Sequence, residues 1–220
     1  MDTILSFLRA LAQNNDRNWF LDHKPDYEEA RRRFEDLALR FIEGVAAFDE
    51  RCRGLALKDC TYRIYRDIRF SADKSPYKTH FGVYVCPQGK KSGRAGYYLH
   101  LQPHTEEYFL CAGLYNPTPA VLHSIRDDVA GGGGEALRQA LALAPDFALP
   151  WDKALRRIPK GYDPADDFSE FYRLRSFELM KPLTLSEVRS AGFLQNSLKA
   201  LSRTHAFNEL LNRAVDYLEN

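Results

Sequence analysis

The segment from Arg63 to His80 holds the side chains of this sequence that are best suited to chemistry. Its cations are Arg63, Arg66, Arg69, Lys74 and Lys78. An arginine guanidinium presents a planar fork that can hold a carboxylate or a phosphate at two points, and a lysine adds a compact positive charge. This composition predicts an anion-binding site in which these five side chains are the ligand-binding groups.

Groups that can transfer protons accompany the cations. Tyr77 and His80 lie at the end of the segment, and His100 lies in a later run that has the alternating pattern of a strand. Histidine titrates near neutral pH, and both histidine and tyrosine can exchange a proton with a bound molecule. On neighbouring strands the two histidine rings can face each other. Tyr77, His80 and His100 are therefore the candidate catalytic residues.

The charge of the chain is unevenly distributed. The net charge at pH 7 is only +1, yet residues 51–100 contain eleven Lys and Arg against three Asp. The remainder of the chain contains 20 basic and 27 acidic residues. This polarity favours an anionic ligand at the basic segment. The alternative is a structural network in which the charges pair internally, for example Arg66 with Asp73 or Arg63 with Asp67.

The basic segment belongs to a part of the chain whose pattern is typical of strands. Apolar and polar residues alternate there, as in the run that contains Tyr97, Leu99 and Leu101. Short connections rich in turn-forming residues separate the runs and favour an antiparallel meander. The predicted strands are 61–70, 80–86, 96–102 and 107–115.

Helical patterns flank these strands on both sides. Ile4, Leu5 and Leu8 recur at helical spacing near the start. Near the end, Thr184 and Glu187 have the spacing of a capping box at a helix start. The predicted helices of the second half include 166–176, one ending near 201, and 207–218. The sequence has no internal repeat and no long linker, so it predicts one α+β domain over residues 1–220, with a central antiparallel sheet packed by N-terminal and C-terminal helices.

One arginine has a distinctive place in this pattern. If residues 61–70 form a strand, its two-residue period places Arg66 on the same side as Ile64 and Ile68, facing the core. A charge at such a position must be compensated by a carboxylate or by a bound anion. Arg66 is therefore the residue whose partner should distinguish a ligand site from a structural network.

Several other functions are not indicated. The cysteines Cys52, Cys60, Cys86 and Cys111 form no C-x-x-C pair, which favours reduced thiols in a cytoplasm and no metal site. No stretch approaches the roughly 18 apolar residues of a membrane span. The first residues lack the pattern of a signal peptide. We expect a cytoplasmic protein that needs no metal or organic cofactor and does not act at a membrane, and the sequence leaves its oligomeric state open.

The basic segment resembles the signature of a bacterial family. From Arg63 to Tyr77 it follows the pattern R-x-x-R-D-x-R-F-x-x-D-K-x-x-Y. The other similar runs are 18–20 with 23–24, 96–100, 113–115 and 159–162. The resemblance covers nearly the whole chain, and the family is catalogued as a domain of unknown function, number 2461. It implies membership of that family and transfers no catalytic role to any residue.

Three functions are compatible with these observations. The first is a pocket for a small phosphorylated or carboxylated ligand, with or without catalysis. The second is nucleic-acid binding, in which cations contact phosphates and the interleaved aromatic rings stack on bases, although a pI near 7.7 weighs against it. The third is an interaction protein whose arginine cluster is structural. A concave basic pocket would favour the first, a flat basic stripe the second and a fully paired cluster the third.

Overall fold

The computed structural model describes residues 1–69 and 71–219, and only the backbone of residue 219. The helices are α1 (Asp2–Gln13), α2 (Arg17–Asp22), α3 (Lys24–Ala46), α4 (Leu57–Cys60), α5 (Pro119–Asp128), α6 (Gly134–Ala142), α7 (Leu185–Arg189), α8 (Phe193–Ser202) and α9 (His205–Glu219). Short helical turns are η1 (Glu50–Cys52), η2 (Val129–Gly133), η3 (Trp151–Lys153) and η4 (Ser169–Arg173). The strands are β1 (Phe81–Val85), β2 (Gly96–Gln102), β3 (Glu107–Leu114) and β4 (Phe177–Pro182).

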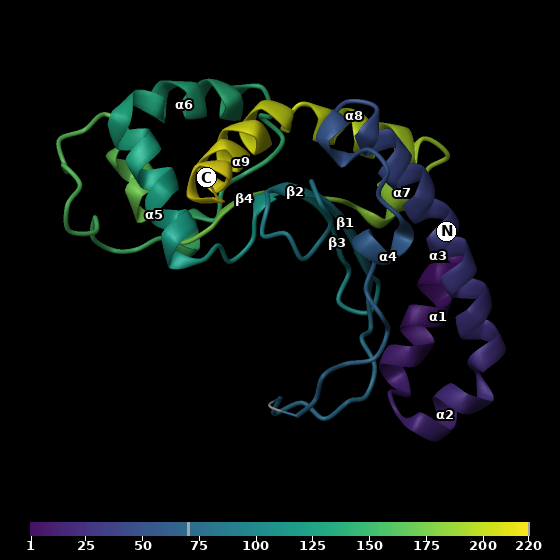
Figure 1. Cartoon of the computed structure of the whole chain (residues 1–220). Coiled ribbons are helices and arrows are strands. Elements are labelled where there is room, and N and C mark those ends of the chain that lie inside the picture. Colours follow the sequence, from purple (N-terminus) through teal and green to yellow (C-terminus); the bar gives the residue numbers. More distant parts are fainter. Residues whose placement is uncertain (70, 220) are drawn as a thin grey trace.

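The strands form one antiparallel sheet in the order β1-β2-β3-β4, and helices from both ends of the chain pack around it (Figure 1). In the register of the sheet, Leu99 pairs with Val83 on one side and with Leu110 on the other. The predicted α+β class with a central antiparallel meander is confirmed. Over the described residues, no helix combines the length and the apolar character needed to cross a membrane.

One face of the sheet carries the hydrophobic core. Val83, Leu99 and Leu110 are fully buried and belong to the same apolar cluster as Leu8 and Phe41 from the N-terminal helices. Helices α1, α3, α8 and α9 contact the strands. Successive residues of a strand point to opposite faces, so the residues between these buried ones belong to the other face.

The other face carries polar and aromatic side chains. Tyr98, His100 and Gln102 alternate with the buried residues of β2, and Tyr84 and Phe109 are their cross-strand neighbours. In Figure 1 the described helices lie above and beside the sheet, while a long connection between α4 and β1 extends below it. This connection and the polar face frame the site described below.

We call the described residues between Thr61 and His80 the arm. Its two legs pair through backbone hydrogen bonds from Arg66 to Pro76 (2.9 Å) and from Lys78 to Ile64 (2.8 Å). Its base is tied to the turn between α1 and α2. The Asn15 side chain donates to the carbonyl of Tyr77 at 2.9 Å and accepts from its amide at 3.1 Å.

The predicted strand over 61–70 is wrong. Within the described part of this range, only isolated bridges occur, from Thr61 to Val83 and from Tyr65 to Tyr77. Residue 70 lies outside the described residues. The residues of this range that favour extended backbone pair instead with the other leg of the arm, so this segment does not extend the sheet. The prediction that Ile64 is buried is confirmed, because its side chain is 2% exposed.

The fourth strand comes from a part of the chain for which the sequence pattern predicts no strand. β4 pairs with β3 over six residues, and its Phe177 and Leu179 point to the core. The helix predicted over 166–176 is reduced to the short turn η4. The capping box is confirmed, because the side chain of Thr184 accepts from the amide of Glu187 at the start of α7.

Candidate functional site

A cavity of about 390 Å³ lies between the arm and the end of β2. Its lining residues are Arg66, Asp67, Tyr77, Lys78, Thr79, His80 and Gln102. We call it the arm cavity. It brings together four of the residues predicted for the site: two proposed anion ligands, Arg66 and Lys78, and two proposed proton-transfer groups, Tyr77 and His80.

The other predicted residues lie outside the lining of this cavity. Arg69 is exposed and holds Asp67, with Nη2 to Oδ2 at 2.6 Å. The amine of Lys74 donates to the carbonyl of Ile68 at 3.0 Å. Arg63 is exposed and makes no hydrogen bond or ion pair with a described residue. These three cations therefore belong to the arm but do not line the arm cavity with Lys78.

Arg66 has an internal partner. It forms an ion pair with Asp73, and Nη1 also donates to Ser75 Oγ at 2.5 Å. Its side chain is 27% exposed and lies on the arm, not on an inward-facing strand position. The backbone amide of Ser75 and the guanidinium of Arg66 together lower the pKa of Asp73 to about 2. Of the two local pairs considered from the sequence, Arg66 with Asp73 is observed, whereas Asp67 is bound by Arg69.

The substitution Arg66→Leu should destabilise the protein only slightly. Asp73 is 60% exposed, so the carboxylate that loses its partner stays hydrated. The decrease in the free energy of unfolding should be well below the ~3–5 kcal/mol that follows removal of one partner from a buried ion pair. Urea unfolding of the variant and of Arg63→Leu, which breaks no ion pair, measures the difference. A loss of the buried-pair size would contradict this interpretation of the Arg66 environment.

Lys78 is the cation of the arm cavity that has no acidic partner. Its side chain is half-buried, and its amine lies 5.3 Å from the centre of the Tyr62 ring. Among the described residues, no carboxylate lies within ion-pair distance of it. Burial, together with the nearby Arg63, lowers the pKa of Lys78. An anion that approaches this partly dehydrated ammonium therefore stabilises it.

His80 and His100 lie side by side, as the strand pattern suggested. Their ring centroids are 4.7 Å apart. Burial lowers the pKa of His80 to about 4, with further contributions from His100 and Lys78. Burial also lowers the pKa of His100. Both imidazoles are therefore neutral at pH 7 and can take part in hydrogen bonds both as donors and as acceptors.

A chain of hydrogen bonds runs across the polar face from His100. Its Nε2 lies 3.2 Å from Oε1 of Gln102, and the amide nitrogen of Gln102 donates to Glu107 at 2.8 Å. An amide oxygen only accepts, so Nε2 carries the proton and Nδ1 accepts. The donor to Nδ1 is the hydroxyl of Tyr98, at 2.9 Å. This chain links a phenol to a carboxylate through a neutral imidazole.

Tyr98, Gln102 and Glu107 are members of this chain that the sequence did not indicate. The usable signal was the alternation of Tyr98, His100 and Gln102 on one side of β2. The position of Tyr98 also depends on Gly82 on the neighbouring strand. A Cβ atom at Gly82 would lie 2.3 Å from the Tyr98 hydroxyl oxygen, so only glycine leaves room for this ring.

The arm cavity places the cation Lys78 beside the neutral imidazole of His80. Over residues 1–69 and 71–219, no group of three or more His, Cys, Asp or Glu is arranged to hold a metal ion. The four cysteines are buried, and burial raises the pKa of Cys86 to about 11 and that of Cys60 to about 12. Thiolate chemistry at these two positions is therefore disfavoured at neutral pH.

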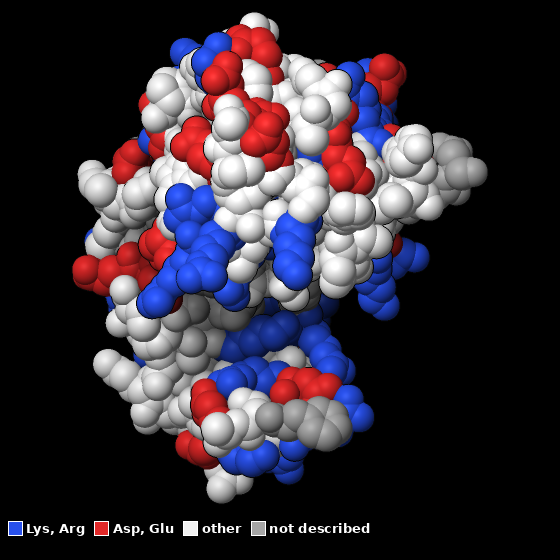
Figure 2. All heavy atoms as spheres, turned by 90° about the vertical axis from the view of Figure 1, so that its left-hand side faces the viewer, with Lys and Arg blue, Asp and Glu red and all other residues white. Residues whose placement is uncertain are grey.

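Basic side chains gather around a hollow of the molecule. Figure 2 shows Lys and Arg side chains in and beside a recess between the upper and lower parts of one face. The arrangement is concave and not a flat stripe.

Comparison with known proteins agrees with the resemblance noted for the basic segment. The family described as "Conserved hypothetical protein (DUF2461)" matches residues 3–209. The search of curated proteins found no match, and the search of solved structures found none. The match covers most of the 220 residues and includes the arm, the sheet and the helices on both sides. The chain therefore belongs to the DUF2461 family.

Proposed function

We propose that the protein binds a small anionic ligand, bearing a phosphate or a carboxylate, in the arm cavity. The observation that carries the proposal is Lys78, a half-buried cation beside the cavity with no carboxylate of the described residues at ion-pair distance. An anion there would compensate this charge. Arg66 lines the same cavity and can add a hydrogen bond, although its main partner is Asp73.

The proposed ligand would lie next to groups able to exchange a proton. His80 lines the cavity, and His100 lies behind it with the hydrogen-bond chain to Glu107. A neutral imidazole in this position can donate or accept a hydrogen bond to the ligand, while its lowered pKa makes it a weak base at neutral pH. Tyr77 has a different role in this proposal. Its ring stacks on Phe20 with 4.0 Å between centroids, so it positions the arm.

Nucleic-acid binding is the weaker alternative. The basic side chains gather in a recess, whereas a nucleic-acid strand would need a groove that continues across the surface. The reading of the cluster as purely structural accounts for Arg66 and Arg69, which have carboxylate partners. It does not account for Lys78, so a small-ligand site remains the proposal.

Inorganic phosphate should raise the melting temperature of the wild-type protein, because a ligand that binds only the folded state stabilises it by mass action. A phosphate concentration of about 100 times Kd corresponds to roughly 2.7 kcal/mol of stabilisation. In Lys78→Gln the phosphate effect should be clearly smaller than in wild type. The same variant without phosphate should be as stable as wild type or more stable, because it removes a partly dehydrated charge.

The control for this experiment is Lys91→Gln, which makes the same charge change at an exposed lysine in the connection between β1 and β2. Its response to phosphate should match wild type. The proposal fails if Lys78→Gln and Lys91→Gln respond to phosphate equally, since phosphate would then act on the protein without occupying the arm cavity.

A further inference from the structure

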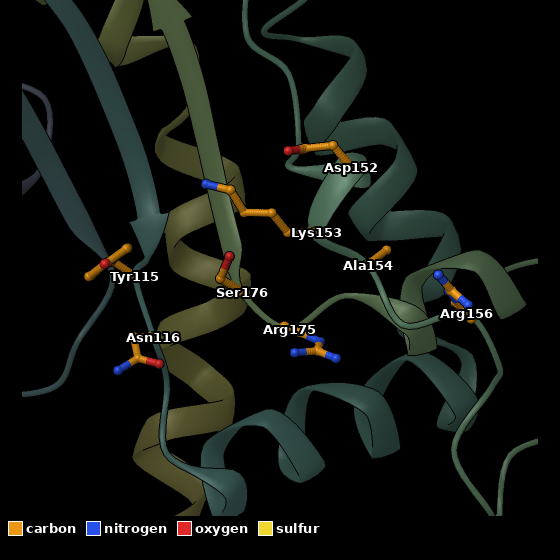
Figure 3. A pocket seen from close by; sticks show the side chains of 8 residues that line it. All are labelled: Tyr115, Asn116, Asp152, Lys153, Ala154, Arg156, Arg175 and Ser176. Atoms are coloured by element: carbon orange, nitrogen blue, oxygen red, sulfur yellow. The ribbon is translucent and has the colours of Figure 1, made fainter. Parts of the chain in front are cut away.

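A second and larger cavity, of about 760 Å³, lies at the opposite end of β3 from the arm cavity. Its lining residues are Tyr115, Asn116, Asp152, Lys153, Ala154, Arg156, Arg175 and Ser176. We call it the β4 cavity. Three separate stretches of chain build it: the residues after β3, those before β4, and the segment around η3 (Figure 3).

The β4 cavity has a surplus of positive charge. Lys153, Arg156 and Arg175 line it, against the single carboxylate of Asp152. None of these three cations forms an ion pair with a residue in the described ranges. Glu178 on β4 also interacts with Lys153, and burial raises the pKa of this carboxyl above its usual value. Even with both acids counted, the lining stays positive.

A buried arginine adds to this charge from behind. The side chain of Arg126 in α5 is only 9% exposed, and its Nη2 donates to the carbonyl of Leu174 at 2.9 Å. Leu174 directly precedes Arg175, so the guanidinium of Arg126 lies close behind the cavity wall. Its Nε has no hydrogen-bond partner among the described residues. A buried cation without a carboxylate favours an anion in the neighbouring space.

The remaining lining groups indicate what kind of anion would fit. Tyr115 is 78% exposed, which leaves its ring available for stacking. Figure 3 shows Tyr115 and Asn116 on one wall, Arg156 on the other, and Arg175 and Ser176 between them. Arginine forks bind phosphate oxygens, an exposed tyrosine ring can stack on a base, and amide and hydroxyl groups can bind its polar edge or a sugar. The volume lies within the usual range for small-ligand sites, about 300–1,000 Å³.

We propose that the β4 cavity binds a nucleoside phosphate, with Arg156, Arg175 and Lys153 on the phosphates and Tyr115 against the base. The proposal is independent of the arm cavity, because the two cavities share no lining residue. It concerns binding only and involves no covalent step.

Isothermal titration calorimetry of the full chain with adenosine 5′-diphosphate tests the proposal. Wild type should bind one equivalent, and Kd should rise at least tenfold in Arg175→Gln and in Arg156→Gln. The matched control is Arg157→Gln, which removes an exposed charge next to Arg156 but outside the cavity lining. Its Kd should stay within twofold of wild type. Circular dichroism of each variant verifies that it is folded, and Arg156, which is exposed, remains usable if Arg175→Gln does not fold.

Two further arms identify the binding mode. Tyr115→Ala should weaken binding of adenosine 5′-diphosphate and leave binding of pyrophosphate unchanged, because only the nucleotide has a base to stack. Lys78→Gln should leave the nucleotide affinity unchanged, which separates this site from the arm cavity. The proposal is overturned by the absence of saturable binding at millimolar nucleotide, by equal losses in Arg156→Gln and Arg157→Gln, or by a loss in Lys78→Gln without one in Arg175→Gln.

Discussion

Acidification from about pH 6.5 to about pH 4 should reduce the free energy of unfolding by up to about 3 kcal/mol through His80 alone. The pKa of His80 is lowered to about 4 in the folded protein, mainly by burial and also by His100 and Lys78. Between these pH values the unfolded chain binds a proton at this residue and the folded chain does not. The stabilisation is therefore complete above the unfolded pKa and disappears as the pH falls to the folded one.

Urea unfolding at a series of pH values measures this effect. The groups facing His80 are cationic or neutral, namely Lys78, Arg66, His100 and Gln102, apart from Asp67, which Arg69 binds. In His80→Gln the slope between pH 6.5 and 4 should become shallower, whereas His104→Gln, at an exposed histidine, should keep the wild-type slope. Identical pH profiles for His80→Gln and wild type would contradict the assignment. Phosphate should lower the pH at which acid unfolds the wild-type protein, because an anion beside Lys78 raises the pKa of His80.

The substitution Gly113→Ala should cost about 3 kcal/mol or more of folding stability, at the upper end for a single methyl group. Gly113 has a φ of 116°, in a region that other residues rarely adopt, and an added Cβ would lie 2.0 Å from the carbonyl oxygen of Phe177. This oxygen belongs to the backbone, so it cannot move away by a change of rotamer as a side-chain atom could. The β3–β4 pairing would therefore have to shift, and with it the wall of the β4 cavity at Ser176.

Gly54→Ala separates strain from steric overlap in this experiment. Gly54 also has a positive φ, 77°, but no atom lies within 4 Å of a Cβ placed there. This control should lose only about 1 kcal/mol, from backbone strain. Both losses can be measured by thermal or urea unfolding. If the two variants lose the same stability, the close approach of β4 to Gly113 does not limit the packing of the sheet.

The core of the fold could be predicted from sequence because its signals are local. Alternation in 80–86, 96–102 and 107–115 gave three strands to within a residue or two of their observed ends. The pattern failed for 61–70 because β propensity reports a preference for extended backbone and not the partner with which that backbone pairs. It also failed for β4, whose six residues include the charged Glu178 and Lys181 and end in Pro182.

The candidate site was predictable in composition and less so in arrangement. The charge surplus of residues 51–100 pointed to the arm, and two of its five candidate cations line the arm cavity. Arg69 is bound by an aspartate two residues away, a pairing that depends on a turn the sequence did not specify. The β4 cavity could not be foreseen, because Tyr115, Arg156 and Arg175 are distant in sequence. β3–β4 pairing joins the first and the last, and hydrogen bonds between Leu155 and Arg173 bring Arg156 to them.

The attachment of the arm to Asn15 has a mechanical consequence. The Asn15 amide holds both backbone groups of Tyr77, as a neighbouring strand would, and Phe20 stacks on the same residue. Displacing the arm at its base would break all three interactions at once, so the base of the arm is anchored to the N-terminal helices. Lys78 and His80 follow the anchored residue Tyr77, whereas Arg66 lies just beyond the bridge from Tyr65 to Tyr77. The half of the arm cavity that holds Lys78 and His80 is therefore the half that these three interactions anchor directly.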